Sequence, residues 1–205
     1  MEDEFYSYEP SRGHGLPHNP FNAIIGPRPI GWISTRGPDG RFNLAPYSFF
    51  NAFAYAPPVI GFGSSGTKDT LRNARETREF VWNLATMALG RQMNLTSAAV
   101  APGVSEFELA GLTPLPSTRV AAPRVAESPV AFECVVTQIV QLEDSRGDPM
   151  PNWVVFGEVV VAHIAQRLLV NGIYDTAAAE PILRAGGTDA YAKISAETMF
   201  RMPRP

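Results

Sequence analysis

The sequence has little of the chemistry that metal sites and disulfide-bonded folds require. Its 205 residues include one cysteine, Cys134, and three histidines. An internal disulfide is therefore excluded, and a cysteine-based zinc site would have too few ligands. Cys134 lies in an apolar run, where we expect a buried, unreactive thiol. The sequence predicts neither a resident metal nor a disulfide framework.

Basic residues and long apolar runs are scarce as well. The 17 Lys and Arg are outnumbered by 20 Asp and Glu, and no basic cluster forms a surface for nucleic acid. No apolar run approaches the roughly 18 residues that cross a bilayer, and residues 1–4 (MEDE) are acidic where a secretory signal would be basic. We expect a cytoplasmic protein that binds a small molecule and has no membrane or nucleic-acid partner.

Short β-branched and aromatic runs between Gly, Pro and Asp residues predict a mainly β fold. We expect an N-terminal arm over residues 1–20 and a single domain over residues 21–205. The predicted strands are a hairpin over 30–35 and 41–45, strands at 49–55, 59–62 and 79–85, and a long hairpin over 130–142 and 153–165 with a turn at 143–152. Helices are expected at 67–77 and near 87–97, and a wrapping loop at 110–129.

Residues 61–66 (GFGSSG) match a dinucleotide-binding glycine motif, but the surrounding sequence argues against that fold. No acidic residue ends the following strand, and alternating strand and helix units are absent. A phosphate-binding Walker loop also fails, because Lys68 falls one place late. Small and hydroxyl residues before a helix start still suit a phosphate, with an ordinary turn and helix cap as the alternative. Lys68 is one of only two lysines, so its charge either meets that phosphate or is simply solvated.

Residues 43–51 (NLAPYSFFN) set polar side chains among aromatics beside a proline. Main-chain groups freed by the proline would suit the edge of a flat heteroaromatic ring, although an irregular strand corner explains the same pattern. His163 shares a strand face with Val159 and Val161, which favours a structural histidine. Because no hydrolase motif or metal-ligand spacing appears, any chemistry must come from a cofactor.

Three ordered segments, 27–35 (PRPIGWIST), 39–63 and 68–85, resemble the flavin reductase-like family with the FMN-binding split barrel, including flavoredoxin-type proteins. Residues 156–163 and 183–194 are similar to the second half of that family. The resemblance implies a six-stranded antiparallel, Greek-key split barrel with a few peripheral helices. It also implies a homodimer that holds FMN, with FAD as the alternative cofactor.

The resemblance assigns roles to individual residues. It implies that the phosphate is bound by Ser48, Ser64, Lys68 and Thr70. It implies that the flavin ring is lined by Thr35, Asn43, Ala45 and Pro46, with Phe50 and Asn51 near the cofactor. Arg184 and Tyr191, in a tail that reads RAGG where the family reads RLGG, would border the flavin or the substrate. His163 is the catalytic candidate, although the family's second histidine is replaced here by Ala165.

The function implied is that of an NAD(P)H:flavin oxidoreductase, in which hydride passes from a nicotinamide to flavin N5. Such an enzyme can supply reduced flavin to a monooxygenase. The alternative is an FMN-holding electron carrier without NAD(P)H turnover. A third reading, a split barrel for another ligand such as haem, fits the retained residues 68–70 (KDT) and 43–48 (NLAPYS) less well.

Overall fold

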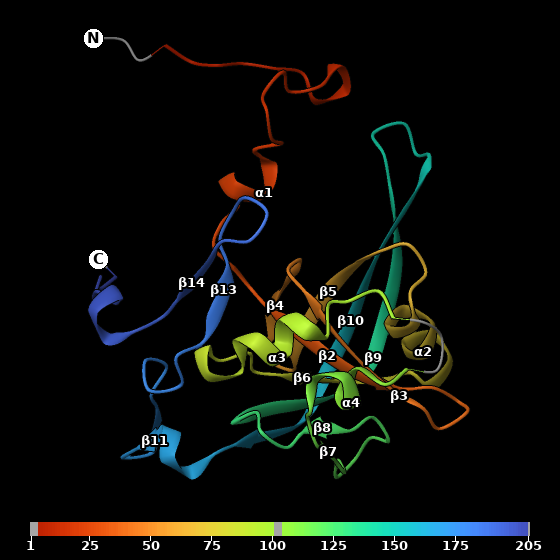
Figure 1. Ribbon diagram of the computed structural model, residues 1–205, viewed down its shortest axis with the longest axis vertical. Coiled ribbons are helices and arrows are strands. Elements are labelled where there is room, and N and C mark those ends of the chain that lie inside the picture. The colour runs from red at the N-terminus through yellow and green to blue at the C-terminus, as the bar shows by residue number, and fades with distance from the viewer. Residues whose placement is uncertain (1–3, 101–103, 205) are drawn as a thin grey trace.

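The computed structural model describes residues 4–100 and 104–204. Within them, the main sheet has seven antiparallel strands in the order β3-β2-β6-β9-β10-β5-β4, so the mainly β fold is confirmed (Figure 1). The resemblance implied six strands in the barrel, and the seventh is the edge strand β4. The bounds are β2 Gly31–Arg36, β3 Phe42–Tyr47, β4 Phe50–Tyr55, β5 Pro58–Ser65, β6 Glu79–Asn83, β9 Val130–Glu143 and β10 Pro149–Ile164.

The two predicted hairpins form. Strands β2 and β3 meet at a turn in which Gly40 has a φ of +85°, a conformation that glycine adopts without strain. Strands β9 and β10 are longer than predicted, because pairing continues to Glu143 and Pro149 and leaves only five residues for the turn. The Asp144 carboxylate closes that turn by accepting hydrogen bonds from the N–H groups of Arg146 and Asp148. The predicted turn at 143–152 was therefore too long.

The sheet curls into a barrel that closes between β5 and the segment after β3. The Gly63 N–H donates to the Phe49 carbonyl at 2.7 Å. A Cβ at Gly63 would lie 3.1 Å from the Phe49 Cβ, so a larger residue would hold the two segments apart. The barrel interior is filled by buried apolar side chains, which include Ile33, Phe62 and Phe80. This closure gives the split barrel and fixes the end of β3 beside β5.

Short helices cover the outside of the barrel. Helix α2 (Asp69–Thr77) and the pair η2 (Met87–Leu89) and α3 (Gly90–Leu95) confirm the two predicted helices. Helices α1 (Phe21–Ile24) and α4 (Glu106–Ala110) were not predicted. The expected wrapping loop holds one small ribbon of β7 (Pro114–Leu115) and β8 (Arg124–Val125). No helix among the described residues is long and apolar enough to span a membrane.

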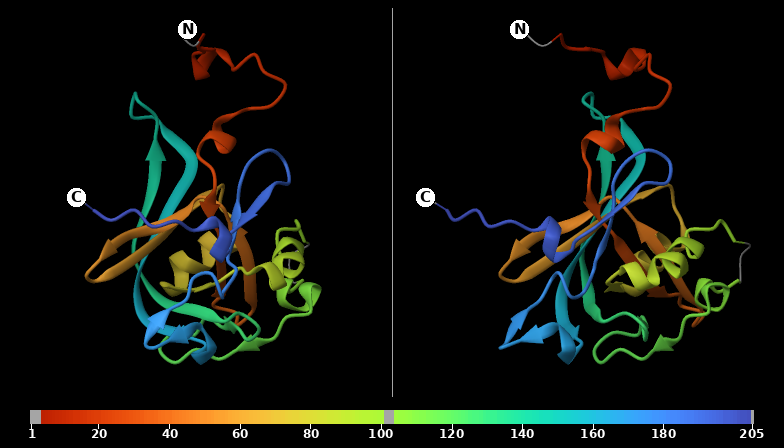
Figure 2. Two further views of the ribbon diagram at one scale, coloured as in Figure 1. Left: turned by 90° about the vertical axis from the view of Figure 1, so that its left-hand side faces the viewer. Right: turned by 60° about the vertical axis from the view of Figure 1, so that its left-hand side comes forward.

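The chain ends lie outside the barrel. A small sheet joins β1 (Arg28–Pro29) to β13 (Ile182–Arg184) and β14 (Tyr191–Lys193), and a two-stranded ribbon joins β11 (Leu169–Val170) to β12 (Ile173–Tyr174). Short 3-10 turns are η1 (Pro10–Arg12), η3 (Gln166–Leu168) and η4 (Ala196–Thr198). The segment before α1 projects away from the barrel, on the side toward which the β9–β10 hairpin also extends (Figures 1 and 2).

Candidate functional site

A cavity of about 560 Å³ lies between the ends of β3 and β5, the start of α2 and the loop after α3. We call it the α2 cavity. Six of the ten residues that the sequence nominated for the cofactor line it: Asn43, Ala45, Pro46, Ser48, Lys68 and Thr70. These residues come from segments twenty positions apart, 43–48 and 68–70, so the fold brings together the two motifs that the sequence analysis treated separately.

The start of α2 supplies the positive charge of the cavity. Lys68 is the N-cap residue of α2, with an extended backbone, and Thr70 follows in the first turn. Among the described residues Lys68 makes no ion pair or hydrogen bond with its side chain, so its ammonium group is free to meet a ligand. The N-terminus of the helix adds the positive end of its dipole. Both features suit a phosphate group.

Tyr47 contributes a buried hydroxyl that lies beside the hydroxyls of Thr70 and Ser64. Its side chain is only 7% exposed, and its ring packs at 4.9 Å from that of Phe62. The hydroxyl forms no hydrogen bond to the described residues. Burial raises the pKa of Tyr47 to about 12, so the group is a hydrogen-bond donor at neutral pH. The hydroxyl is closed to solvent, so it lies behind the cavity surface and supports Thr70 from within the barrel.

Thr35 stands behind the cavity wall rather than in it. Its buried hydroxyl accepts a hydrogen bond from Asn73 Nδ2 at 3.0 Å, and Asn43 Nδ2 donates to Thr70 Oγ1 at 2.7 Å. These bonds fix Asn43 and Thr70 between β3 and α2. The structure therefore gives Thr35 a supporting position and leaves Asn43 as the residue that reaches the cavity.

Three other nominated residues do not line the α2 cavity. Ser64 is buried and donates to the Gly66 carbonyl at 3.1 Å, while its neighbour Ser65 faces the cavity. Phe50 stacks on Trp82, with ring centroids 5.7 Å apart. Phe50 and Asn51 instead line a second pocket beyond Ser48.

His163 lies on β10 with a buried carboxylate, not with the cavity. Its Nε2 is 2.6 Å from Glu133 Oε1 on β9. Glu133 also accepts hydrogen bonds from the N–H groups of Thr118 and Arg119, at 2.7 and 2.6 Å. Burial raises the pKa of Glu133, but these N–H groups and His163 outweigh it and lower the pKa to about 2. The contacts give His163 a position that supports the loop 117–122.

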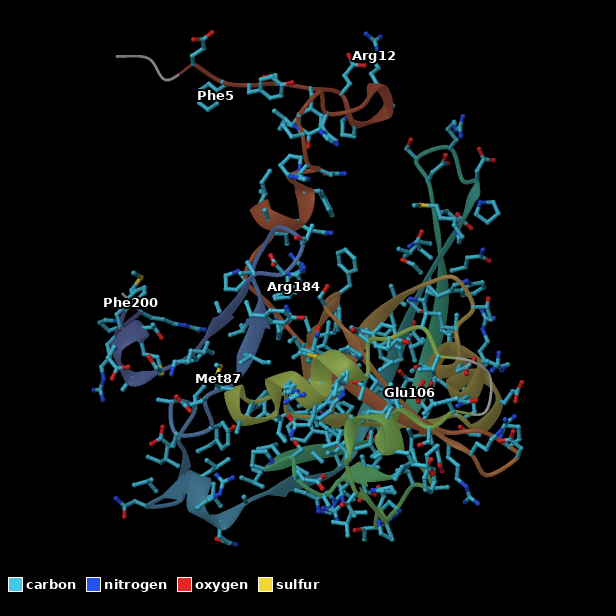
Figure 3. All side chains as sticks on the ribbon, viewed as in Figure 1. Phe5, Arg12, Met87, Glu106, Arg184 and Phe200 are labelled. Carbon is cyan, nitrogen blue, oxygen red and sulfur yellow. The ribbon has the colours of Figure 1, made fainter. Side chains whose placement is uncertain are left out.

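Arg184 and Tyr191 pair with each other at the β13–β14 hairpin. The guanidinium carbon of Arg184 lies 5.0 Å from the Tyr191 ring centroid, and its N–H groups bind four carbonyls of the hairpin loop. Figure 3 shows Arg184 near that hairpin and Glu106 in a separate part of the molecule, on α4. The structure does not bring Arg184 and Tyr191 into the α2 cavity.

The sequence analysis missed several lining residues: Tyr47, Phe49, Gly63, Ser65, Asp69, Glu106 and the loop 96–100. Glu106 accepts a hydrogen bond from the Leu44 N–H at 3.2 Å, and burial raises its pKa. Tyr47 stood inside a quoted motif, and its inward direction follows from strand alternation. The loop 96–100 and Glu106 carry no local signal, because only the packing of α3 and α4 on β3 brings them there.

A phosphate monoester attached to a flat polar ring fits this set of residues. Lys68, the N-terminus of α2 and the Ser48 hydroxyl gather donors at one place. Strand β3 is an edge of the sheet, and although its Leu44 N–H donates to Glu106, the residues Ala45 and Pro46 next to it line the cavity, where a flat ring can lie against them. FMN has both parts.

Comparisons with known proteins agree with this chemistry. Residues 26–178 match the model of the flavin reductase like domain. An uncharacterized protein of Aquifex aeolicus is 38% identical over 173 residues, which cover 80% of this chain and 84% of that protein. An uncharacterized protein of Halalkalibacterium halodurans is 37% identical over 193 residues, which cover 90% of each chain.

Solved structures share the fold. Nitrilotriacetate monooxygenase component B from Bacillus cereus has a TM-score of 0.86 and 31% identity, and the match covers 98% of this chain and 100% of that one. The 2-nitrobenzoate 2-nitroreductase of Pseudomonas fluorescens has a TM-score of 0.78 and 28% identity, covering 89% and 88%. Flavoredoxin of Desulfovibrio vulgaris, at 22% identity with a TM-score of 0.74, covers 86% and 90% and supports the fold.

Proposed function

The chain belongs to the flavin reductase-like family, and we propose that it is an NAD(P)H:flavin oxidoreductase that holds FMN in the α2 cavity. Family membership supports a flavin-binding oxidoreductase. The observation that carries the assignment of the cavity is the meeting of free donors there: the Lys68 ammonium group, the start of α2 and the Ser48 hydroxyl. A phosphate dianion would satisfy all three.

In this proposal, different lining residues of the α2 cavity bind the phosphate and the ring of FMN. Lys68, Thr70 and Ser48 bind the phosphate, while Asn43 and the edge of β3 at Ala45 and Pro46 hold the ring. Asn43 and Thr70 are held rigidly by their hydrogen bond, so the binding geometry exists before the cofactor arrives. Such preorganisation favours tight noncovalent binding.

FMN, when bound, supplies the acceptor for a nicotinamide hydride. The residues of the chain contribute binding, orientation and the partial exclusion of water. None of the lining residues needs to act as a general acid or base for this reaction. This agrees with the absence of any hydrolase motif in the sequence.

We place the reductase upstream of a monooxygenase, because the similar Bacillus cereus protein is a monooxygenase component. We also propose a homodimer. Strand β4 is an exposed edge of the sheet, on which Phe53 is 58% and Tyr55 is 95% exposed, and a second copy would cover it. Sedimentation should give twice the chain mass of 22.3 kDa, and a flavin-loaded monomer would contradict the dimer.

One anaerobic experiment tests the function. The FMN-loaded protein is mixed with NADH or NADPH in a stopped-flow instrument, and the visible flavin absorbance is followed. We expect bleaching by at least one of the two nucleotides. If dithionite bleaches the bound flavin but neither nucleotide does, the protein is an electron carrier and the reductase proposal is wrong.

A further inference from the structure

A second pocket of about 480 Å³ lies on the other side of Ser48 and Phe49 from the α2 cavity. We call it the Arg28 pocket. Its wall is mainly apolar, and Arg28 is the charged residue among those that line it: Ile25, Gly26, Pro27, Arg28, Pro29, Ser48, Phe49, Phe50, Asn51, Phe53, Gly61 and Val154. Nothing in the FMN proposal uses Arg28.

Arg28 is buried, and only one of its guanidinium nitrogens, Nη1, makes hydrogen bonds to the described residues. Its side chain is 8% exposed. The Nη1 group donates to the carbonyls of Asn22 and Ile25, so one side of the guanidinium clamps the turn of α1. The Nε group is buried without a partner, and Nη2 makes no hydrogen bond to the described residues. Nε is also closed to solvent, so a carboxylate meets Nη2 first and completes two parallel hydrogen bonds with the Nε–Nη2 edge once the Arg28 side chain shifts.

The charge of Arg28 is also uncompensated. Its cross-strand partner in the β1–β13 pair is Arg184, another cation. Burial, and then the charge of Arg184, lower the pKa of Arg28. Neither arginine makes an ion pair with a carboxylate among the described residues. Burying an unpaired cation beside a like charge is costly, so an anion at this place would be strongly favoured.

The surroundings restrict what kind of anion fits. Phe49, Phe50 and Phe53 line the pocket, and the guanidinium carbon of Arg28 lies 5.7 Å from the Phe49 ring centroid. The guanidinium group of Arg184 already donates hydrogen bonds to four carbonyls of its own loop. The edge of Arg28 is therefore the single guanidinium edge left for an anion. One edge matches one carboxylate, and the aromatic wall matches a flat apolar body.

We propose that the Arg28 pocket binds a small aromatic carboxylate, with the carboxylate on the Nε–Nη2 edge of Arg28 and the ring among the phenylalanines. Arg28 itself does not line the α2 cavity, so its carboxylate site is distinct from the groups proposed for the phosphate. The two sites meet at Ser48 and Phe49. If the proposed function holds as well, the carboxylate lies beside the FMN site, as a second substrate or an effector would.

The first test uses the unaltered protein and benzoate as the probe. Benzoate, benzamide, phenyl phosphate and acetate are titrated by calorimetry, with and without FMN. Benzoate should bind about tenfold or more tightly than benzamide, which has the same shape without the charge, and than acetate, which lacks the ring. Equal binding of benzoate and benzamide, tighter binding of phenyl phosphate, or no binding of benzoate at millimolar concentration would overturn the proposal.

The second test uses variants. Arg28→Gln should weaken benzoate binding about ten- to a hundredfold, and Arg28→Lys should restore part of it, since a lysine keeps the charge but loses the paired hydrogen bonds. Arg36→Gln, at an exposed position, should change nothing. If a folded Arg28→Gln protein binds benzoate as tightly as the unaltered protein, Arg28 is only a clamp for α1 and the proposal is wrong. Loss of FMN binding alone would overturn the proposed function and leave this site intact.

Discussion

The α2 cavity and the cluster around Glu133 both contain buried polar groups, but they differ in how many hydrogen bonds are made. Glu133 accepts bonds from three main-chain N–H groups and from His163, so its bonding capacity is filled within the chain. In the α2 cavity the exposed Lys68 ammonium group has no partner among the described residues, and the Tyr47 hydroxyl, beside Thr70 and Ser64, makes no hydrogen bond of good geometry. A filled polar network stabilises the fold, whereas an unfilled one indicates where a ligand binds.

The largest effect on the unfolding free energy should come from removing the Glu133 carboxylate. Glu133→Ala would leave the N–H groups of Thr118, Arg119 and the buried Val120 without their acceptor and would remove the partner of His163. We expect a loss of about 3–5 kcal/mol of unfolding free energy, measured by chemical denaturation. FMN affinity of the folded fraction should stay within about threefold, because Glu133 does not line the cavity.

Glu79→Ala is the matched control. Glu79 accepts a single hydrogen bond, from the Ala121 N–H at 2.7 Å, in the same loop. Its loss should cost about 1 kcal/mol. If Glu133→Ala and Glu79→Ala lower the unfolding free energy by the same amount, the Glu133 cluster stabilises the fold no more than a single hydrogen bond does. The contrast drawn between the Glu133 cluster and the α2 cavity would then be wrong.

The same cluster predicts how stability depends on pH. The pKa of Glu133 is about 2 in the folded protein, below its ordinary value of 4.5. A lowered folded pKa means that the contribution is complete above the ordinary value and is lost as the pH falls from about 4.5 through about 2. Unfolding free energy measured across that window should fall less steeply in Glu133→Gln than in the unaltered protein. An identical slope would contradict the role of the ionised carboxylate.

Removing the charge of Lys68 from the α2 cavity should weaken FMN binding and leave the unfolding free energy unchanged. Lys68→Ala should weaken FMN about ten- to a hundredfold, and riboflavin far less, since only FMN carries a phosphate. The second lysine supplies the control, because Lys193 is exposed and paired with Glu180 at 2.7 Å. Lys193→Ala should bind FMN normally. Equal losses for FMN and riboflavin in Lys68→Ala would mean that the lysine supports the fold.

A great deal of the fold and part of the site follow from the sequence. The two hairpins and α2 were predictable, because turn residues and helix formers act locally. The ends of β9 and β10 were not, since pairing between the strands overrode the Pro and Asn residues near 149–152. Motif residues such as Asn43 and Lys68 reach the cavity as expected. Thr35 does not, because Asn73 on α2 binds its hydroxyl, and that contact depends on tertiary packing.

A smaller loss of FMN affinity should follow from removing only the Tyr47 hydroxyl. Tyr47→Phe keeps the ring on Phe62 and deletes one donor. FMN should bind about three- to tenfold more weakly, with the melting temperature unchanged or slightly raised, because a buried unsatisfied group is removed. Tyr6→Phe, in the N-terminal segment outside the barrel, should leave the FMN affinity unchanged. Unchanged FMN affinity in Tyr47→Phe would show that the hydroxyl does not serve the ligand.

The smallest effect on chemistry should come from His163. Its ring is engaged by Glu133, so His163→Ala should lower the melting temperature and slow flavin reduction by less than about tenfold. Stopped-flow rates at saturating NAD(P)H separate chemistry from binding. A hundredfold slower reduction in a folded, FMN-loaded variant would make His163 a catalytic residue. The Glu133 cluster would then serve the reaction as well as the fold.

Calorimetric titration of the flavin-free protein with FMN and, in parallel, with riboflavin tests the central claim most directly. If the unpartnered groups of the α2 cavity form a phosphate site, FMN binds with one molecule per chain and about tenfold or more tightly than riboflavin. If FMN fails to bind at micromolar concentration, or binds no more tightly than riboflavin, the α2 cavity is not the cofactor site.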